Sequence, residues 1–187
     1  MSIICYKAGF IVGLVAGRFL NVCIFRLPKR KSLIKPGSYC PFCEASIQPY
    51  DNIPLLSYIL LMGKWRNCRE SISIQYPIVE MLTGLFLLLL AFNTVQTGRS
   101  AAVFGVYTYV TLGLIVVSGV DMKHEIIPDE ISLAGIPVGI LLSVLIPALH
   151  EDVPLFWEGF SSLSPHLYSL ISSVIGIIVG GGTLWLI

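Results

Sequence analysis

The chain is organised around the stretch Val116-Val-Ser-Gly-Val-Asp-Met-Lys-His-Glu-Ile-Ile-Pro-Asp129. An apolar run ends there at the carboxylate of Asp121, and a second carboxylate, that of Asp129, follows eight residues later. A carboxylate at the mouth of a membrane helix is costly to desolvate, and by default it marks a functional site or a polar cavity. We therefore take Asp121 as the candidate chemical centre.

The composition of the chain indicates an integral membrane protein. Of its 187 residues, 55% are hydrophobic and only 12% are charged, and the mean hydropathy is +0.83. In a typical soluble domain about a quarter of the residues are charged. The net charge of +1 gives no basic excess for nucleic acid. We expect membrane lipid as the surroundings and no nucleic-acid partner.

Five apolar runs predict an all-α, polytopic membrane helix bundle. Each is long enough to approach or cross a hydrocarbon core of ~30 Å at ~1.5 Å per residue. The predicted organisation is a first span in residues 1–25, a polar domain in 26–71 and a membrane domain in 72–187, with spans at about 72–92, 101–120, 131–149 and 167–187. We expect Pro137 to kink the fourth span.

The first span carries small residues on one helix face. Gly9, Gly13 and Gly17 recur every four residues, a pattern that allows close packing against another helix. Arg18 and Asn21 lie about one turn apart near the other end of the span. Two interpretations of this pair stay open: snorkelling with helix-end capping, or substrate binding.

Positive charge gathers in residues 26–71. Eight of the twelve basic residues lie there: Arg26, Lys29, Arg30, Lys31, Lys35, Lys64, Arg66 and Arg69. Loops rich in Lys and Arg stay in the cytoplasm, so we expect the N-terminus outside and this domain inside. The apolar run 53–62 is too short to span, and we interpret it as a helix or interfacial segment packed on the membrane.

Cysteines in the polar domain have metal-ligand spacing. Cys40-Pro-Phe-Cys43 has the form of one zinc knuckle, and Trp65-Arg-Asn-Cys68 stands in the place of the second. Paired knuckles usually hold structural zinc in a tetrahedron of thiolates. Here Cys40, Cys43 and Cys68 are the three candidate ligands, and the fourth would be water or another side chain. The alternative is three free thiols, because disulfides are rare in the cytoplasm.

Two further acids accompany Asp121 as candidate supporting residues. Asp129 follows Pro128 and precedes an apolar run, so it fits a helix cap or a substrate contact better than catalysis. Glu80 lies about a turn inside the second span. A structural hydrogen bond to another span and a role in methyl transfer are both open for Glu80.

Several motifs in a fixed order give the chain a family resemblance. They are Phe19-Leu-Asn-Val-Cys-Ile-Phe-Arg-Leu-Pro28, Cys40-Pro-Phe-Cys43, Asn52-Ile-Pro-Leu-Leu-Ser-Tyr58, Gly63-Lys-Trp-Arg-Asn-Cys68, Tyr76-Pro-Ile-Val-Glu80, and Asp121 to Asp129. From about residue 9 to residue 137 the chain resembles a type IV prepilin peptidase.

The resemblance implies a bifunctional enzyme of the bacterial inner (cytoplasmic) membrane. Such an aspartic endopeptidase cuts basic leader peptides from type IV prepilins and from the pseudopilins of type II secretion, at the cytoplasmic face. It then methylates the new N-terminus with S-adenosylmethionine. The first catalytic aspartate of the family corresponds to Asp121, and the second lies in a later G-x-G-D motif.

The sequence departs from the family at that second motif. Gly180-Gly-Gly182 is followed by Thr183, and no G-x-G-D occurs in the 187 residues. An aspartic protease needs two carboxylates that share one proton. The sequence therefore predicts a chain that ends before the second catalytic aspartate.

Two other functions stay open at this point. The chain could be a non-catalytic membrane assembly factor, with the cysteine region as a metal-ribbon docking module. It could also be an ion or proton carrier that uses Glu80 and Asp121 as relay groups. A carrier requires acids distributed through the bilayer, whereas Glu80, Asp121 and Asp129 are expected near one face. That placement favours a site at the membrane rim.

Overall fold

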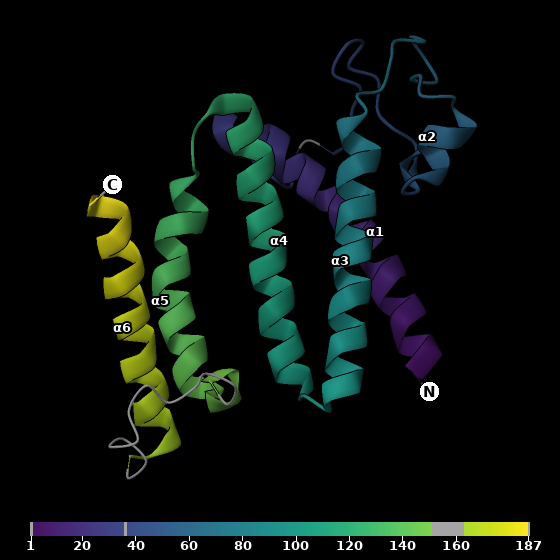
Figure 1. The fold of residues 1–187 in the computed structure, drawn as a ribbon. Coiled ribbons are helices and arrows are strands. Elements are labelled where there is room, and N and C mark those ends of the chain that lie inside the picture. Colours follow the sequence, from purple (N-terminus) through teal and green to yellow (C-terminus); the bar gives the residue numbers. More distant parts are fainter. Residues whose placement is uncertain (1, 36, 151–162, 187) are drawn as a thin grey trace. The chain divides into compact units, whose positions relative to one another are not determined.

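The computed structural model describes residues 2–35, 37–150 and 163–186, and helices dominate it (Figure 1). The α-helices are α1 (Ser2–Arg26), α2 (Leu56–Leu60), α3 (Gln75–Thr97), α4 (Ala101–His124), α5 (Asp129–Leu145) and α6 (Pro165–Leu186). Short 3-10 helices cover η1 (Leu27–Lys29), η2 (Pro49–Asn52) and η3 (Pro147–His150). The predicted all-α class is confirmed.

Four helices in the described residues are long and apolar enough to cross a membrane. They cover Ile3–Lys29, Gln75–Thr97, Ala101–His124 and Pro165–Thr183. These helices fit a multi-pass membrane protein. Helix α5 continues through Pro137 but has only 17 residues, or about 26 Å at ~1.5 Å per residue, so the crossing predicted at 131–149 stays a prediction. The stretch between the spans predicted at 131–149 and 167–187 falls largely on residues 151–162, outside the described residues.

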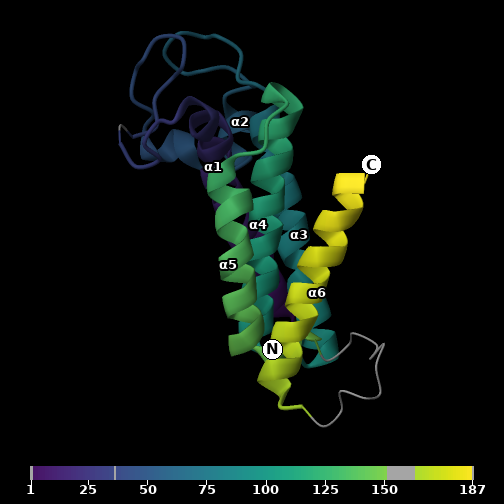
Figure 2. The same ribbon diagram turned by 90° about the vertical axis from the view of Figure 1, so that its left-hand side faces the viewer.

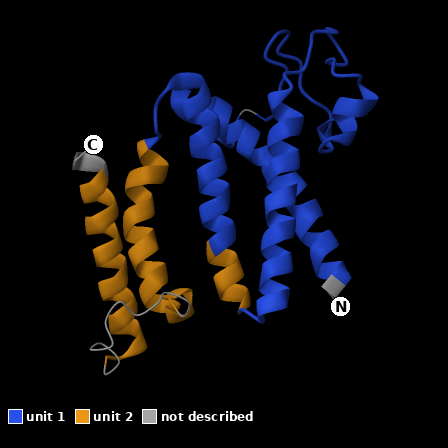
Figure 3. Cartoon of the chain, in the orientation of Figure 1, with its two compact units in different colours: residues 1–99, 107–128 blue, residues 100–106, 129–187 orange. Residues whose placement is uncertain are grey.

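The chain divides into two compact units (Figure 3). The first contains residues 1–99 and 107–128, and the second contains residues 100–106 and 129–187. In the first unit, α1 crosses α3, as Figures 1 and 2 both show. The loop between these two helices, residues 27–74, carries α2 and the three candidate cysteine ligands.

The face by which α1 meets α3 is the glycine face predicted from the sequence. A Cβ atom on Gly13 would lie 2.7 Å from the Cα of Gly84, and one on Gly17 would lie 2.7 Å from the Cα of Glu80. Gly9 faces α3 in the same way. Such distances leave no room for a side chain, so the prediction of close helix packing is confirmed.

In the second unit, α5 and α6 pack together through serine hydroxyls. The hydroxyls of Ser143 on α5 and Ser173 on α6 both donate to the carbonyl oxygen of Ser169, at 3.1 and 2.9 Å. Ser143 is 3% exposed. Hydrogen bonds between serines join helices where lipid gives apolar side chains little reason to associate.

Candidate functional site

Asp121 lies in the last turn of α4, within the first unit. The helix ends at a left-handed residue, Glu125 (φ 53°), whose N–H donates to the Asp121 carbonyl oxygen at 2.9 Å. Lys123 and His124 share this turn, where positive charge complements the helix dipole. The Asp121 side chain is exposed, and its carboxylate has no hydrogen-bond or ion-pair partner among the described residues.

The position of Asp121 is fixed by packing two residues earlier. Ile24, near the end of α1, is 1% exposed and packs against Gly119 of α4. A Cβ on Gly119 would lie 2.5 Å from the Cδ1 atom of Ile24. Val120 on the same turn is fully buried. The end of α4 is therefore held against the end of α1, and the Asp121 side chain at this end is exposed.

Asp129 is the first residue of α5, in the second unit. It is exposed, and with Glu130 it places two acids in the first turn, where negative charge stabilises a helix. The capping and catalytic roles considered for Asp129 both stay predictions.

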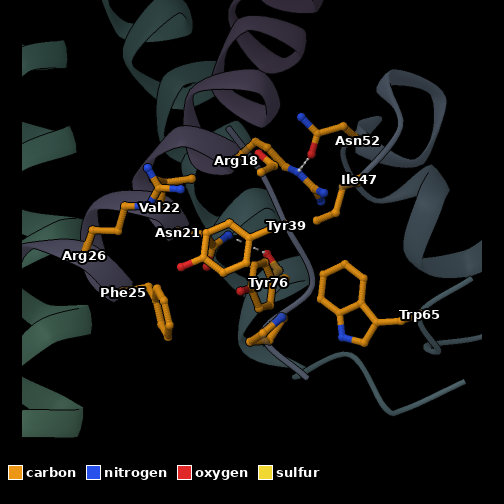
Figure 4. Close-up of a pocket in the computed structure, with 12 residues that line it drawn as sticks. Arg18, Asn21, Val22, Phe25, Arg26, Tyr39, Ile47, Asn52, Trp65 and Tyr76 are labelled. Carbon is orange, nitrogen blue, oxygen red and sulfur yellow. Dashed lines mark hydrogen bonds between the residues drawn. The ribbon is translucent and has the colours of Figure 1, made fainter. Parts of the chain in front are cut away.

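Glu80 is the centre of a buried network in the first unit, which we call the buried anchor (Arg18, Asn52, Leu55 and Glu80). Glu80 is 1% exposed. Its Oε1 atom accepts from Arg18 Nη1 at 3.0 Å, and its Oε2 atom accepts from the backbone N–H of Leu55 at 2.8 Å. The Nε of Arg18 donates to Asn52 Oδ1 at 2.7 Å (Figure 4). These charge-assisted bonds tie the loop to two membrane helices.

The anchor holds a backbone conformation that side chains disfavour. Leu55 has φ 56° and ψ −46°, a conformation that costs on the order of 1–3 kcal/mol for a residue other than glycine. A second hydrogen bond between α1 and α3 lies close by. Asn21 Nδ2 donates to the Tyr76 carbonyl oxygen at 3.1 Å (Figure 4), and it also donates to the Gly17 carbonyl oxygen within α1 at 3.2 Å. Both Arg18 and Asn21 are thus engaged in bonds within the protein, and Glu80 makes the inter-span bond considered for it.

Next to the anchor lies a small cavity, which Figure 4 shows from the side of Tyr39. Its lining includes Arg18, Asn21, Trp65 and Tyr76, and its volume is about 60 Å³. That space holds a few water molecules at most.

The two cysteine-region turns have the same backbone hydrogen bonds. The N–H groups of Cys40 and Trp65 each donate to the carbonyl five residues later, at 2.9 and 2.8 Å. Their carbonyls each accept from the N–H four residues later, at 3.0 Å in both turns. Single antiparallel bridges flank each turn: Tyr39 with Ser46, and Lys64 with Ser71. Trp65 therefore occupies the place that Cys40 has in the first turn.

The three thiols lie together, as the sequence predicted. The sulfur atoms of Cys40, Cys43 and Cys68 are all within 4.8 Å of one another, and those of Cys40 and Cys68 are 3.6 Å apart. Sulfurs bound tetrahedrally to zinc at ~2.3 Å would be about 3.8 Å apart, so the cluster fits a zinc ion. Trp65 is 8% exposed and packs edge-on against Tyr76, with ring centroids 6.3 Å apart.

The thiols of this cluster differ in acidity. Burial raises the pKa of Cys40, but hydrogen bonds from the backbone of Cys43 and Phe42 and from the neighbouring thiols outweigh it, so the pKa is lowered. A backbone hydrogen bond at Glu70 lowers the pKa of Cys68, but burial and the other two thiols outweigh that effect, so the pKa is raised. As the pH rises, the thiol of Cys40 therefore loses its proton before that of Cys68 does.

Sequence reasoning missed one part of this arrangement. It did not assign Asn52 and Leu55 to a network with Glu80, because nothing in the local pattern shows which distant groups pair. The repeated turn was predicted, because Trp65-Arg-Asn-Cys68 was placed as the second knuckle, and the equal 25-residue offset from Cys40 to Trp65 and from Cys43 to Cys68 agrees with it.

Comparison with known families matches one part of the chain to a described domain. Residues 11–94 match the family described as Bacterial Peptidase A24 N-terminal domain. This range contains most of α1, the whole cysteine-containing loop and most of α3. It therefore includes the buried anchor and the thiol cluster, and it ends before Asp121.

Curated proteins extend the similarity to nearly the whole chain. A prepilin leader peptidase/N-methyltransferase of Neisseria gonorrhoeae is 31% identical over 95% of this chain and 62% of the relative. A type 4 prepilin-like proteins leader peptide-processing enzyme of Escherichia coli O78:H11 is 33% identical over 90% of the chain and 61% of the relative. A third relative, from Myxococcus xanthus, is 38% identical over 72% of the chain and 39% of its own length. The chain thus spans less than two thirds of the length of these relatives. No solved structure matches it significantly.

Proposed function

We propose, from this similarity, that the chain belongs to the prepilin leader peptidase/N-methyltransferase family and that it contributes Asp121 to an aspartic endopeptidase of the bacterial inner membrane. The enzyme removes basic leader peptides from type IV prepilins and pseudopilins at the cytoplasmic face and methylates the new N-terminus. The observation that carries the proposal is the exposed carboxylate of Asp121 at the end of a candidate span, where no described residue pairs with it. Its test is leader cleavage by matched variants, argued in the Discussion.

In the proposed mechanism, Asp121 is one member of a carboxylate pair. The charged member takes a proton from water, which attacks the scissile carbonyl, and the neutral member polarises that carbonyl. Because the two groups share one proton, they titrate as a unit and neither has a pKa of its own. By family resemblance, the second member comes from a G-x-G-D motif.

The geometry at Asp121 suits a substrate that is part membrane helix and part basic leader. By family resemblance, a prepilin has an apolar helix in the bilayer and a positively charged leader beyond it. In this proposal, the two segments meet at the carboxylate of Asp121, which stands at the end of a helix long enough to span a membrane. For methylation, the resemblance implies S-adenosylmethionine as the donor. The 60 Å³ cavity is too small for it, since ligand sites have volumes of ~300–1,000 Å³.

We further propose that Cys40, Cys43 and Cys68 hold a structural zinc ion. The ion would cross-link the two equivalent turns through thiolates and would take no part in the peptidase chemistry. The sulfur distances support this role, and Trp65 explains why only three thiolates are available.

The zinc proposal predicts that Trp65→Cys raises zinc occupancy. A fourth thiolate in the place equivalent to Cys40 would replace a weaker ligand such as water. We expect metal analysis of the purified protein to give more zinc per chain for Trp65→Cys than for the parent, with slower loss to a chelator. Trp65→Phe is the matched control, because it removes the indole without adding a thiol. Absence of zinc from all three proteins would leave the fold without a metal and refute the proposal.

The topology proposal places the N-terminus outside and residues 26–71 inside. Gln96 is exposed near the far end of α3, and Lys35 is exposed in the loop. In a Cys5→Ser background, we expect a membrane-impermeant thiol reagent to label Gln96→Cys in intact cells. It should reach Lys35→Cys, and the native loop cysteines, only after permeabilisation. The opposite pattern would mean that the chain is inserted the other way round.

A further inference from the structure

The segment 53–62, which contains α2, exposes a dense group of large apolar side chains. Their exposed fractions are 44% for Ile53, 55% for Leu56, 67% for Ile59, 74% for Leu60 and 85% for Met62. The surrounding loop is polar and basic. A contiguous apolar group of this kind marks an interaction surface.

The buried anchor fixes the depth of this segment along the membrane helices. Leu55 is bonded to Glu80, which lies five residues into α3, or about 7 Å along its axis. Asn52 is bonded to Arg18, which lies eight residues before the end of α1, or about 12 Å along that helix. Figure 1 shows α2 beside the first turns of α3. The segment thus lies level with the ends of two candidate spans.

Most of the backbone N–H groups of the segment meet the requirement that a bilayer imposes. In lipid, every N–H needs a partner, because no water can supply one. The N–H of Leu55 donates to Glu80, and that of Ile53 donates to the hydroxyl of Ser57 at 3.0 Å. Local carbonyls accept from the N–H groups of Leu56, Ser57, Ile59, Leu61, Met62 and Gly63, at 2.6–3.1 Å.

The charges around the segment fit a lipid headgroup region. No acid occurs in residues 53–62. The nearest acid in sequence, Asp51, is held by Arg66 with contacts of 2.6–3.1 Å, and Glu80, which binds Leu55, is paired with Arg18. Exposed Lys64 directly follows the segment. Basic groups beside an apolar surface attract anionic lipids.

We propose that residues 53–62 dip into the membrane leaflet on the side of the loop, with Leu56, Ile59, Leu60 and Met62 among the acyl chains. The partner is the lipid itself: acyl chains for the apolar side chains and anionic headgroups for the flanking Lys64. Segment 53–62 is then a third part of the first unit that contacts the membrane, in addition to α1 and α3. The buried anchor sets how deep this segment enters the leaflet.

Tryptophan quenching by brominated lipid tests this contact. Leu60→Trp is the probe, because its side chain is 74% exposed and the exchange should not disturb the fold. Glu70→Trp, at an exposed position of the second cysteine turn, is the matched control. Each full chain is placed in phosphatidylethanolamine/phosphatidylglycerol vesicles, with or without bromine on the acyl chains. The signal of the parent, from Trp65, Trp157 and Trp185, is subtracted.

We expect the emission added by Leu60→Trp to be blue-shifted, lost in brominated lipid and unaffected by aqueous acrylamide. The emission added by Glu70→Trp should show the reverse. Ile59→Trp should behave as Leu60→Trp does. Quenching of the Leu60→Trp probe by acrylamide and not by brominated lipid would overturn the proposal. Protection of the probe from both reagents would mean that protein covers the segment, and it would equally overturn lipid contact.

Discussion

We expect Asp121→Asn to abolish leader cleavage. The enzyme for this test is a chimera that joins residues 1–187 to the C-terminal part of the Neisseria gonorrhoeae relative, which the chain matches over 62% of its length. Asparagine keeps the shape of the side chain and removes its charge, so it can neither take nor share a proton. Losing one member of a catalytic unit lowers the rate by on the order of 10⁴-fold. The measurement is leader removal from a prepilin in membranes.

Three controls separate catalysis from folding in this experiment. Asp121 is exposed and its carboxylate is unpartnered among the described residues, so the variant should unfold at the same temperature as the parent. Asp129→Asn should be milder, because its predicted role is a cap or a substrate contact. Methylation of a substrate that has already been cut should persist in Asp121→Asn. Full cleavage by Asp121→Asn, or by the 187-residue chain alone, would overturn the assignment.

The second large effect is expected for Arg18→Leu. This change leaves the carboxylate of Glu80, which is 1% exposed, without its cationic partner. Breaking a buried ion pair from one side costs about 3–5 kcal/mol, because an uncompensated charge stays buried. We expect a lower unfolding temperature in detergent and faster proteolysis within the loop 27–74, since the anchor that holds Leu55 is weakened.

The double variant Arg18→Leu/Glu80→Leu distinguishes charge from packing. Replacing both members of a buried pair with apolar groups is often nearly neutral, so we expect the double variant to recover much of the stability. Glu80→Leu alone should cost less than Arg18→Leu, because Arg18 is 18% exposed and keeps its bond to Asn52. Equal destabilisation in Arg18→Leu and the double variant would show that the network acts through packing and not through charge.

The fold class and several contacts follow from local patterns in the sequence. Apolar runs locate helices because length and hydropathy decide whether a segment can enter a bilayer. The spacing of Gly13 and Gly17 predicted the face that meets α3, since residues four apart share one side of a helix. The spacing of Cys40, Cys43 and Cys68 predicted the thiol cluster.

Other features depend on tertiary structure that local patterns do not contain. Hydropathy placed the end of the second span at residue 92, whereas α3 continues to Thr97, because a helix can extend past its apolar part. The sequence showed Arg18 and Glu80 in two separate apolar runs and did not indicate that they are partners. Only the packing of Gly17 against Glu80 brings the two helices close enough for an ion pair.

The anchor also sets an order of events during biosynthesis. Arg18 and Glu80 are 62 residues apart, so at about 5–20 residues per second the arginine is made roughly 3–12 s before its partner. During that interval its charge must be solvated by water or headgroups, as a long side chain near a helix end can be. Leu55 likewise has no Glu80 carboxylate to bind until α3 has been translated. The cysteine turns are thus made, and their thiols are open to a metal ion, before the loop can be fastened to the membrane helices.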